Sequence, residues 1–182
     1  ARAAPALWVV RVVPGVRDRR GRVWYVTGAL ALEAARWLHG GLSRAQEETD
    51  RLTRQRPDVR LELDVDAHRQ GINDLLLGAS ELARADVRHK KEHRGADLVG
   101  ADLQGADLRG ASLRGAYLIG ADLRAADLRM ADVIGADFRG ADIRGADLTG
   151  SIFLIQSQLD AAKGDAGTRL PPRLNRPTHW SA

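Results

Sequence analysis

A five-residue repeat runs through about a third of the chain and restricts its fold more than any other feature. Twelve pentads follow one another without a gap from Gly95 to Leu154, beginning with GADLV and ending with GSIFL. The first position is Gly in ten pentads, the second is Ala in eleven, and the fourth is a large apolar residue in all twelve. Because repeats of this regularity define an architecture, the fold must accommodate a period of five.

Neither a helix nor a straight strand has this period. Five residues turn an α-helix through about 500°, so the leucines would not share a face, and interior glycines cost roughly 1 kcal/mol each relative to Ala. In a straight strand Leu98 and Leu103 would point to opposite sides, and collagen needs Gly at every third position. Short extended segments joined by glycine corners avoid both problems. The pattern therefore predicts a coil with Ala and Leu inside.

The motif ADLRG and its neighbours resemble those of the pentapeptide-repeat family. The family motif is a small residue, a polar residue, a large apolar residue and two freer positions. The resemblance implies a mainly β solenoid, a right-handed quadrilateral β-helix with four pentads per coil. Residues 95–155 would then form about three coils, preceded by a helical region and closed by a C-terminal capping tail.

Stacking every fourth pentad sorts the outward-facing residues into four faces. Two faces should carry solvated ladders of Asp and Arg, and the other two should form an apolar strip along their shared edge. The residues expected in this strip are Val99, Tyr117, Ile119, Ile134, Ile152 and Leu154. A contiguous apolar patch on a protein surface is usually an interaction site. Either the chain's own N-terminal helices cover the strip, or it is a protein-interaction surface for a second copy or for another protein.

Residues 23–94 are expected to be mainly helical. Gly40-Gly41 has the character of a helix stop, and Ser43 begins a capping-box pattern that would open a second helix. The alternation in VRLELDV, residues 59–65, favours a short strand between helices. Residues 1–22 are either two strands around Pro14-Gly15 or the remnant of a larger domain. The stretch from VWYVTGALAL onward resembles actinobacterial-type members of the family, but the upstream cysteines of such relatives are missing here.

The tail, residues 156–182, resembles a recurrent ending of such proteins. Ser157 is expected to cap a short helix that runs through Lys163, with Gly164 as its stop. A solenoid's open end exposes core leucines and unpaired strand edges, which favour aggregation. The apolar residues suited to covering that end are Leu159, Leu170, Leu174 and Trp180.

Composition excludes several kinds of chemistry. The chain has no cysteine, which excludes disulfides, thiol catalysis and Cys-ligated zinc and is compatible with a reducing cytoplasm. His89 and His93 have the spacing of zinc ligands on a helix, but the sequence offers no third ligand. No nucleophile motif, phosphate-binding loop or pair of catalytic carboxylates is present. We therefore expect no enzymatic activity, no cofactor and no metal, and a cytoplasmic protein without a membrane-spanning segment.

The sequence indicates a non-enzymatic, protein-binding scaffold whose partner is unknown. Some members of the family imitate duplex DNA and protect DNA gyrase from inhibitors, which is the alternative that the resemblance implies. The pentads carry nine Asp and six Arg and no Glu or Lys, a net charge of −3, against +4 for the whole chain. Basic clusters at Arg17–Arg22 and Arg88–Arg94 lack a recognition motif, so nucleic acid or acidic lipid is a less favoured partner. A homodimer is a further expectation.

Overall fold

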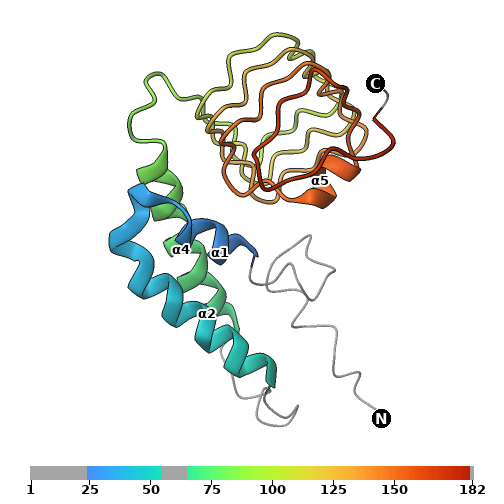
Figure 1. Cartoon of the computed structure of the whole chain (residues 1–182). Coiled ribbons are helices and arrows are strands. Elements are labelled where there is room, and N and C mark those ends of the chain that lie inside the picture. The colour runs from blue at the N-terminus through green and yellow to red at the C-terminus, as the bar shows by residue number, and fades with distance from the viewer. Residues whose placement is uncertain (1–23, 55–64, 181–182) are drawn as a thin grey trace. The chain divides into compact units, whose positions relative to one another are not determined.

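The computed structural model describes residues 24–54 and 65–180, which belong to two compact units, residues 1–83 and 84–182 (Figure 1). We describe each unit by itself. The hairpin or remnant considered for residues 1–22, the basic cluster Arg17–Arg22 and most of the strand expected at 59–65 lie outside the described residues. None of the described helices is both long enough and apolar enough to cross a membrane.

The first unit consists of short helices packed around alanine and leucine side chains. Its elements are α1 (Trp24–Leu30), the 3-10 helix η2 (Glu33–Leu38), α2 (His39–Arg54) and α4 (Val65–Ala83). Within the unit, α4 packs against η2, α1 and α2, and the fully enclosed side chains include Ala29, Ala35, Leu42 and Ala79. Residues 24–54 are thus mainly helical, and residues 65–83 form one helix.

The expected break at Gly40-Gly41 is wrong, because both glycines lie inside α2, as does Ser43. Close approach of the helices explains glycine at position 41, and also at position 78 of α4, whereas a Cβ atom on Gly40 would meet only Arg44 Nη1, at 3.8 Å. A Cβ atom on Gly41 would lie 3.1 Å from Leu75 Cδ2, and one on Gly78 would lie 3.2 Å from Leu38 Cδ1. Such contacts are shorter than ordinary van der Waals separations, so close packing offsets the cost of about 1 kcal/mol for a helical glycine.

The second unit is a solenoid of stacked coils (Figure 1). Within the pentads, its bridges join residues that are twenty positions apart. Parallel β-bridges join residues such as Asp97 and Tyr117, and Tyr117 and Asp137. The described residues of this unit contain single bridges and turns rather than extended strands. Tyr117 N donates to Ala96 O at 2.9 Å, and Leu98 N donates to Tyr117 O at 2.9 Å. Four pentads therefore complete one turn, with one bridge on each side.

Corners between the sides lie where the sequence places glycine. Ten glycines at the first position of the pentad have φ between 62° and 70°, and the two exceptions, Ala125 and Met130, also have positive φ, at 57° and 58°. A backbone hydrogen bond between residues three apart closes each corner. In one example, Ala101 N donates to Leu98 O at 3.1 Å. Because L-residues rarely adopt positive φ, the first position strongly favours glycine for conformational reasons.

The expected interior is confirmed from Leu108 onward. From there to Phe153, the residues at the second and fourth positions are buried, whereas Leu98 and Leu103 in the first coil are half-buried. Pairing begins earlier than Gly95, since Glu92 is bridged to Ser112. The pentad Lys90–Arg94 places Lys91 and His93 where later pentads have Ala and Leu, so the apolar interior ends here.

The segment before this pentad closes one side of the solenoid. Arg84 is fully buried and its Nη1 donates to Gly110 O at 2.9 Å. Val87 lies over the same glycine, where a Cβ atom would be 2.8 Å from Val87 Cγ1. Residues 84–94, which the sequence grouped with the helical region, thus belong to the solenoid unit.

Beyond the pentads, α5 (Gln156–Asp160) and an extended segment continue the stacking. Ser157 lies inside α5 rather than at its N-cap, and α5 ends at Asp160 rather than Lys163, so both expectations are corrected. Gln158 defines the helix start instead, because its Oε1 accepts Ile155 N at 3.0 Å. Its Nε2 donates to Val133 O and Ala136 O at 2.9 Å. The bond to Ala136 O replaces the one that a further coil would have made, whereas Val133 O also accepts the corner bond from Ala136 N at 3.1 Å.

The extended part of the tail lies against the last coil. Lys163 and Arg169 form bridges to Asp142 and Asp147. Leu159, Leu174 and Trp180 are buried and Leu170 is half-buried. Trp180 Nε1 donates to Ala162 O at 3.0 Å, and its ring occupies the space beside Gly164.

We expect Ala125→Gly to stabilise the solenoid, because glycine removes the strain of a positive φ. A positive φ costs an L-residue about 1–2 kcal/mol. Glycine loses more conformational entropy on folding than alanine does, and this loss offsets about 0.5–1 kcal/mol of the gain. Chemical denaturation should therefore show a gain in the free energy of unfolding of about 0–1.5 kcal/mol. The adjacent Ala126→Gly is the matched control and should destabilise, since Ala126 is buried. A loss of stability in Ala125→Gly would contradict the assignment of this corner.

Gly164→Ala should displace Trp180, because the added Cβ would lie 2.5 Å from the indole ring. Loss of the indole contact should shift tryptophan emission to longer wavelength and lower the thermal midpoint. Gly140→Ala is a useful comparison: its Cβ meets nothing within 4 Å, but its φ is 66°, so it should destabilise without changing the emission. Unchanged emission in Gly164→Ala would argue against the position of Trp180.

Candidate functional site: the outer faces of the solenoid

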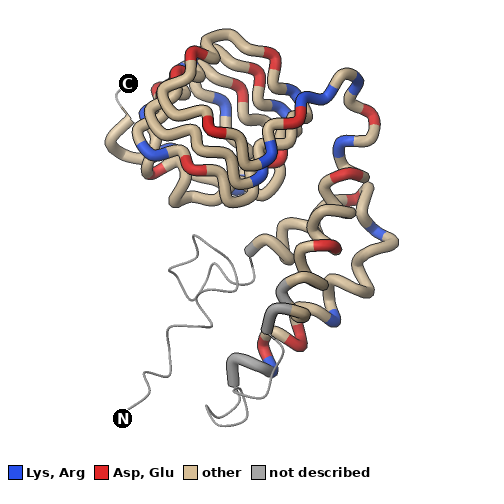
Figure 2. The backbone as a smooth tube through the Cα atoms, turned by 180° about the vertical axis from the view of Figure 1, so that it is seen from behind, with Lys and Arg blue, Asp and Glu red and all other residues tan. Residues whose placement is uncertain are grey.

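Twelve pentads in four-sided coils give four outer faces, which we number in chain order. Face 1 comprises residues 95–99, 115–119 and 135–139, and face 2 comprises 100–104, 120–124 and 140–144. Face 3 comprises 105–109, 125–129 and 145–149, and face 4 comprises 110–114, 130–134 and 150–154. Figure 2 shows acidic and basic positions following one another around these coils.

Every aspartate of the pentads forms part of a corner. In each case Oδ1 accepts the backbone N–H two residues further on, at 2.9 to 3.2 Å. The nine donors are Val99, Gln104, Arg109, Arg124, Arg129, Ile134, Arg139, Arg144 and Thr149. This is the Asx-turn geometry that short polar side chains favour. The repeated Asp is thus explained by local backbone structure, without any catalytic or ligand-binding role.

Four of these aspartates also pair with an arginine two residues later in the same pentad. The Nη2···Oδ2 distances are 2.5 Å for Arg124–Asp122 and Arg129–Asp127, and 2.6 Å for Arg139–Asp137 and Arg144–Asp142. Hydrogen bonds from Arg124 hold the pKa of Asp122 at about 2. The equivalent arginines lower the pKa of Asp127, Asp137 and Asp142. These carboxylates therefore stay ionised, and their charge is neutralised within the pentad.

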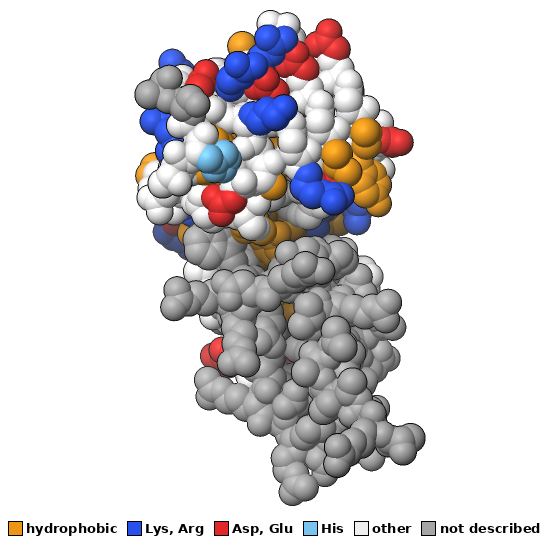
Figure 3. Space-filling view, turned by 90° about the vertical axis from the view of Figure 1, so that its right-hand side faces the viewer, with side chains coloured by type: hydrophobic (Ala, Val, Ile, Leu, Met, Phe, Trp, Pro, Cys, Tyr) orange, Lys and Arg blue, Asp and Glu red, His pale blue; other side chains and the backbone are white. Residues whose placement is uncertain are grey.

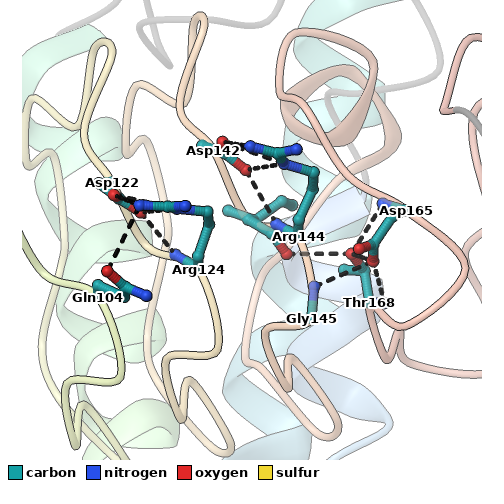
Figure 4. A network of polar contacts seen from close by, with 9 residues as sticks. Gln104, Asp122, Arg124, Asp142, Arg144, Gly145, Asp165 and Thr168 are labelled. Atoms are coloured by element: carbon teal, nitrogen blue, oxygen red, sulfur yellow. Dashed lines mark hydrogen bonds and ion pairs between the residues drawn. The ribbon is translucent and has the colours of Figure 1, made fainter.

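On face 2 the pairs extend into a network that reaches the tail (Figure 4). Arg124 Nη2 also donates to Gln104 Oε1 at 3.4 Å in the coil before it. At the corner that follows Arg144, where face 3 begins, Asp165 Oδ1 of the tail accepts Gly145 N at 3.0 Å and Thr168 N at 2.9 Å. Backbone donation from Gly145 is the main cause that lowers the pKa of Asp165. The polar contacts of face 2 are therefore made along its whole length.

Two further pairs were missed by sequence reasoning. Arg114 Nη1 donates to Asp132 Oδ2 at 2.8 Å on face 4, where both side chains are almost fully enclosed, with exposed fractions of 5% and 0%. Arg169 Nη1 lies 3.3 Å from Asp147 Oδ2 on face 3. The only indication of the Arg114–Asp132 pair in the sequence was that Arg114 lies one coil before Ile134, in whose pentad Asp132 stands. With these two pairs, all six aspartates of the second and third coils are ion-paired.

The first coil differs from the other two. Asp97, Asp102 and Asp107 are exposed, and none of them forms an ion pair with any residue in the described parts of the chain. Two of them lack the arginine two residues later, since Val99 and Gln104 occupy those positions. Negative charge that is not locally neutralised is thus concentrated in this coil.

The expected apolar strip is only partly exposed. Val99 and Tyr117 are 57% and 53% exposed, and Ile119 and Ile134 are half-buried. Ile152 and Leu154, at 2% and 0%, do not face the solvent, which corrects their assignment to the strip. Leu154 turns inward because the chain bends at Phe153, with φ of 63°, instead of at a following glycine. Ile152 is bridged to the enclosed Asp132.

The exposed apolar residues that remain together are Val99, Tyr117 and Ile119, all on face 1. Figure 3 shows one side of the solenoid unit, on which basic and acidic side chains alternate and a group of hydrophobic side chains lies beside a basic one. Face 4 departs from the Asp–Arg pattern in all three coils, but its apolar side chains are buried or half-buried and its Arg114–Asp132 pair is enclosed. On face 1 the departures leave apolar side chains more than half exposed, at Val99 and Tyr117.

The structure does not assemble a metal site in the residues it describes. His89 is exposed at a turn with φ of 55°, and His93 is half-buried in the first paired pentad, above Ser112. Residues 24–54 and 65–180 contain no group of three His, Cys, Asp or Glu side chains with metal-binding geometry.

Comparison with known proteins identifies the repeat. A family model described as pentapeptide repeats, in eight copies, matches residues 94–115 and 116–153. The uncharacterized protein YybG of Bacillus subtilis is 56% identical over 173 residues, covering 93% of this chain, and the chain spans 62% of that protein's length. Among solved structures, one match is HetL from Nostoc, which is described as a pentapeptide repeat protein involved in heterocyst differentiation regulation. It is 32% identical, the match covers 44% of this chain and 38% of the HetL chain, and the TM-score is 0.36. A second Nostoc pentapeptide repeat protein is 35% identical, covers 47% of this chain and 78% of its own, and has a TM-score of 0.35.

Substitution of Asp142 separates its two roles. Asp142→Asn keeps an Oδ1 acceptor for Arg144 N but loses the ion pair, so it should cost little, about 0–1 kcal/mol as for other surface pairs. Asp142→Ala loses the corner bond as well and should cost about 0.5–1.5 kcal/mol more. Urea denaturation of the two variants measures the difference. Equal destabilisation would show that charge, and not the corner, is the main contribution of this residue.

Proposed function

Since this chain belongs to the pentapeptide-repeat family, we propose that its solenoid is a non-enzymatic scaffold that binds another protein. The observation that supports the proposal is that the acidic residues of the pentads take part in structural interactions. All nine aspartates form corners, and those of the second and third coils are also ion-paired, so none of these six is free to act as an acid, base or ligand. What the outer faces offer a ligand is a rigid surface of charged pairs interrupted by apolar side chains on face 1.

Under this proposal the tail serves the scaffold by covering its C-terminal end. Burial of Leu159, Leu174 and Trp180, and the bridges of Lys163 and Arg169 to the last coil, support such a cap. The family relationship supports a right-handed β-helix of about three coils for the pentads. We also place the protein in the cytoplasm, for which the lack of cysteine is the supporting feature.

The alternative, imitation of DNA toward gyrase, is supported by columns of stacked aspartates such as Asp102, Asp122 and Asp142. Two quantities weigh against it. Three coils with a rise of about 4.8 Å make a rod of roughly 14 Å, which matches about four base pairs and so about eight phosphate charges. The pentads carry a net charge of only −3, and arginines neutralise the aspartates of two coils.

Capture of a partner from a lysate of the source organism tests the scaffold, with the full chain as bait and gyrase subunits examined first. We expect saturable retention of a protein that is not gyrase. A parallel supercoiling assay should show no inhibition of gyrase at micromolar protein. Inhibition at or below that concentration would favour the alternative, and sedimentation of the bait alone would identify a homodimer. Failure to retain any protein would contradict the scaffold.

A further inference from the structure

We propose that four residues of face 1 form a docking surface for a basic segment of a partner protein, one in which Lys or Arg stands beside apolar residues. The residues are Asp97, Val99, Tyr117 and Ile119, which we call the face-1 patch. This inference deepens the proposed function, on which it rests, by naming the chemistry of the partner.

Backbone pairing holds the patch rigid. Asp97 and Tyr117 form a β-bridge, Leu98 N donates to Tyr117 O at 2.9 Å, and Gly100 N donates to Ile119 O at 2.9 Å. Val99 and Ile119 occupy the same position in successive coils, so their side chains are neighbours, with Tyr117 alongside. A surface that is already ordered loses little conformational entropy on binding.

The apolar part of the patch is a local departure from the repeat. In the third coil of the same face, Asp137 and Arg139 restore the usual pair, at 2.6 Å. In the first two coils Val99 and Ile119 replace that arginine, and Tyr117 replaces the aspartate. Val99 and Tyr117 are more than half exposed. The departures needed for an apolar contact thus lie together on one face.

Charge indicates which partner would fit this apolar surface. Asp97 accepts the Val99 amide at 3.2 Å but makes no ion pair with any described residue. Each aspartate of the next two coils has a guanidinium within 3.3 Å. An incoming Lys or Arg would supply the cation that Val99 does not, and the Tyr117 ring adds a cation–π contact. Apolar residues beside that cation would cover Val99 and Ile119.

Selection of a displayed library of random 12-residue peptides on the full-length protein tests the proposal. Peptides enriched on the wild type should carry Lys or Arg beside apolar residues. In fluorescence anisotropy their affinity should fall at least tenfold in Val99→Arg, which supplies the missing guanidinium within the chain, and in Tyr117→Ser. Thr149→Arg adds the same charge on face 3 and is the matched control, which should bind as the wild type does.

Several results would overturn the proposal. These are the absence of enriched peptides, the enrichment of acidic peptides, and equal binding by Val99→Arg and the wild type. A dimer that Val99→Arg dissociates would assign the patch to a second copy instead. Nitration of the free protein by tetranitromethane provides a further check, because Tyr117 should react while the buried Tyr25 does not. Protection of Tyr117 in the monomer would show that the chain itself covers the patch. Each of these can occur while lysate capture succeeds, so the docking surface can fail without the scaffold failing.

Discussion

The positive φ at each corner is the constraint on which the rest of the solenoid depends. In extended backbone, equivalent residues five positions apart point to opposite faces, because five is odd. A turn through the left-handed region at each corner restores the inward direction of Ala and Leu. The same turn aligns the backbone so that each coil donates to and accepts from the coil twenty residues away. The hydrophobic interior, the hydrogen-bonded stack and the outward-facing charges therefore share one local cause.

Sequence periodicity was sufficient for the interior and the corners, because both repeat without a gap. It was insufficient wherever a residue type has more than one physical use. Gly40 and Gly41 together are typical of a helix end, yet both lie inside α2, where Gly41 allows close packing against Leu75. Leu154 followed the outward position of its pentad, but Ile155 stands where the next glycine would be, so the chain turns earlier and Leu154 is enclosed. The corner role of the aspartates depends on atomic distances that no spacing shows.

The charges of the pentads have a mainly structural explanation, which changes how the surface should be interpreted. A column of aspartates suggests a polyanion when only sequence is considered. In the structure each carboxylate stabilises its own corner, and in four pentads the arginine two residues later also neutralises it. The parts of the surface available for recognition are therefore the exceptions to the repeat. They are the carboxylates of the first coil, which form no ion pair with a described residue, and the apolar residues on face 1.

The twenty-residue spacing of the bridges also bears on how such a chain can change length during evolution. The corner and the interior residues are contained within one pentad, and in four pentads the charge pair is as well. A duplicated segment therefore brings most of these interactions with it. Gain or loss of twenty residues leaves every remaining side chain on its original face. Gain or loss of five instead rotates everything beyond it by a quarter turn and moves Tyr117 out of line with Asp97. Selection on a binding surface would thus favour growth by whole coils.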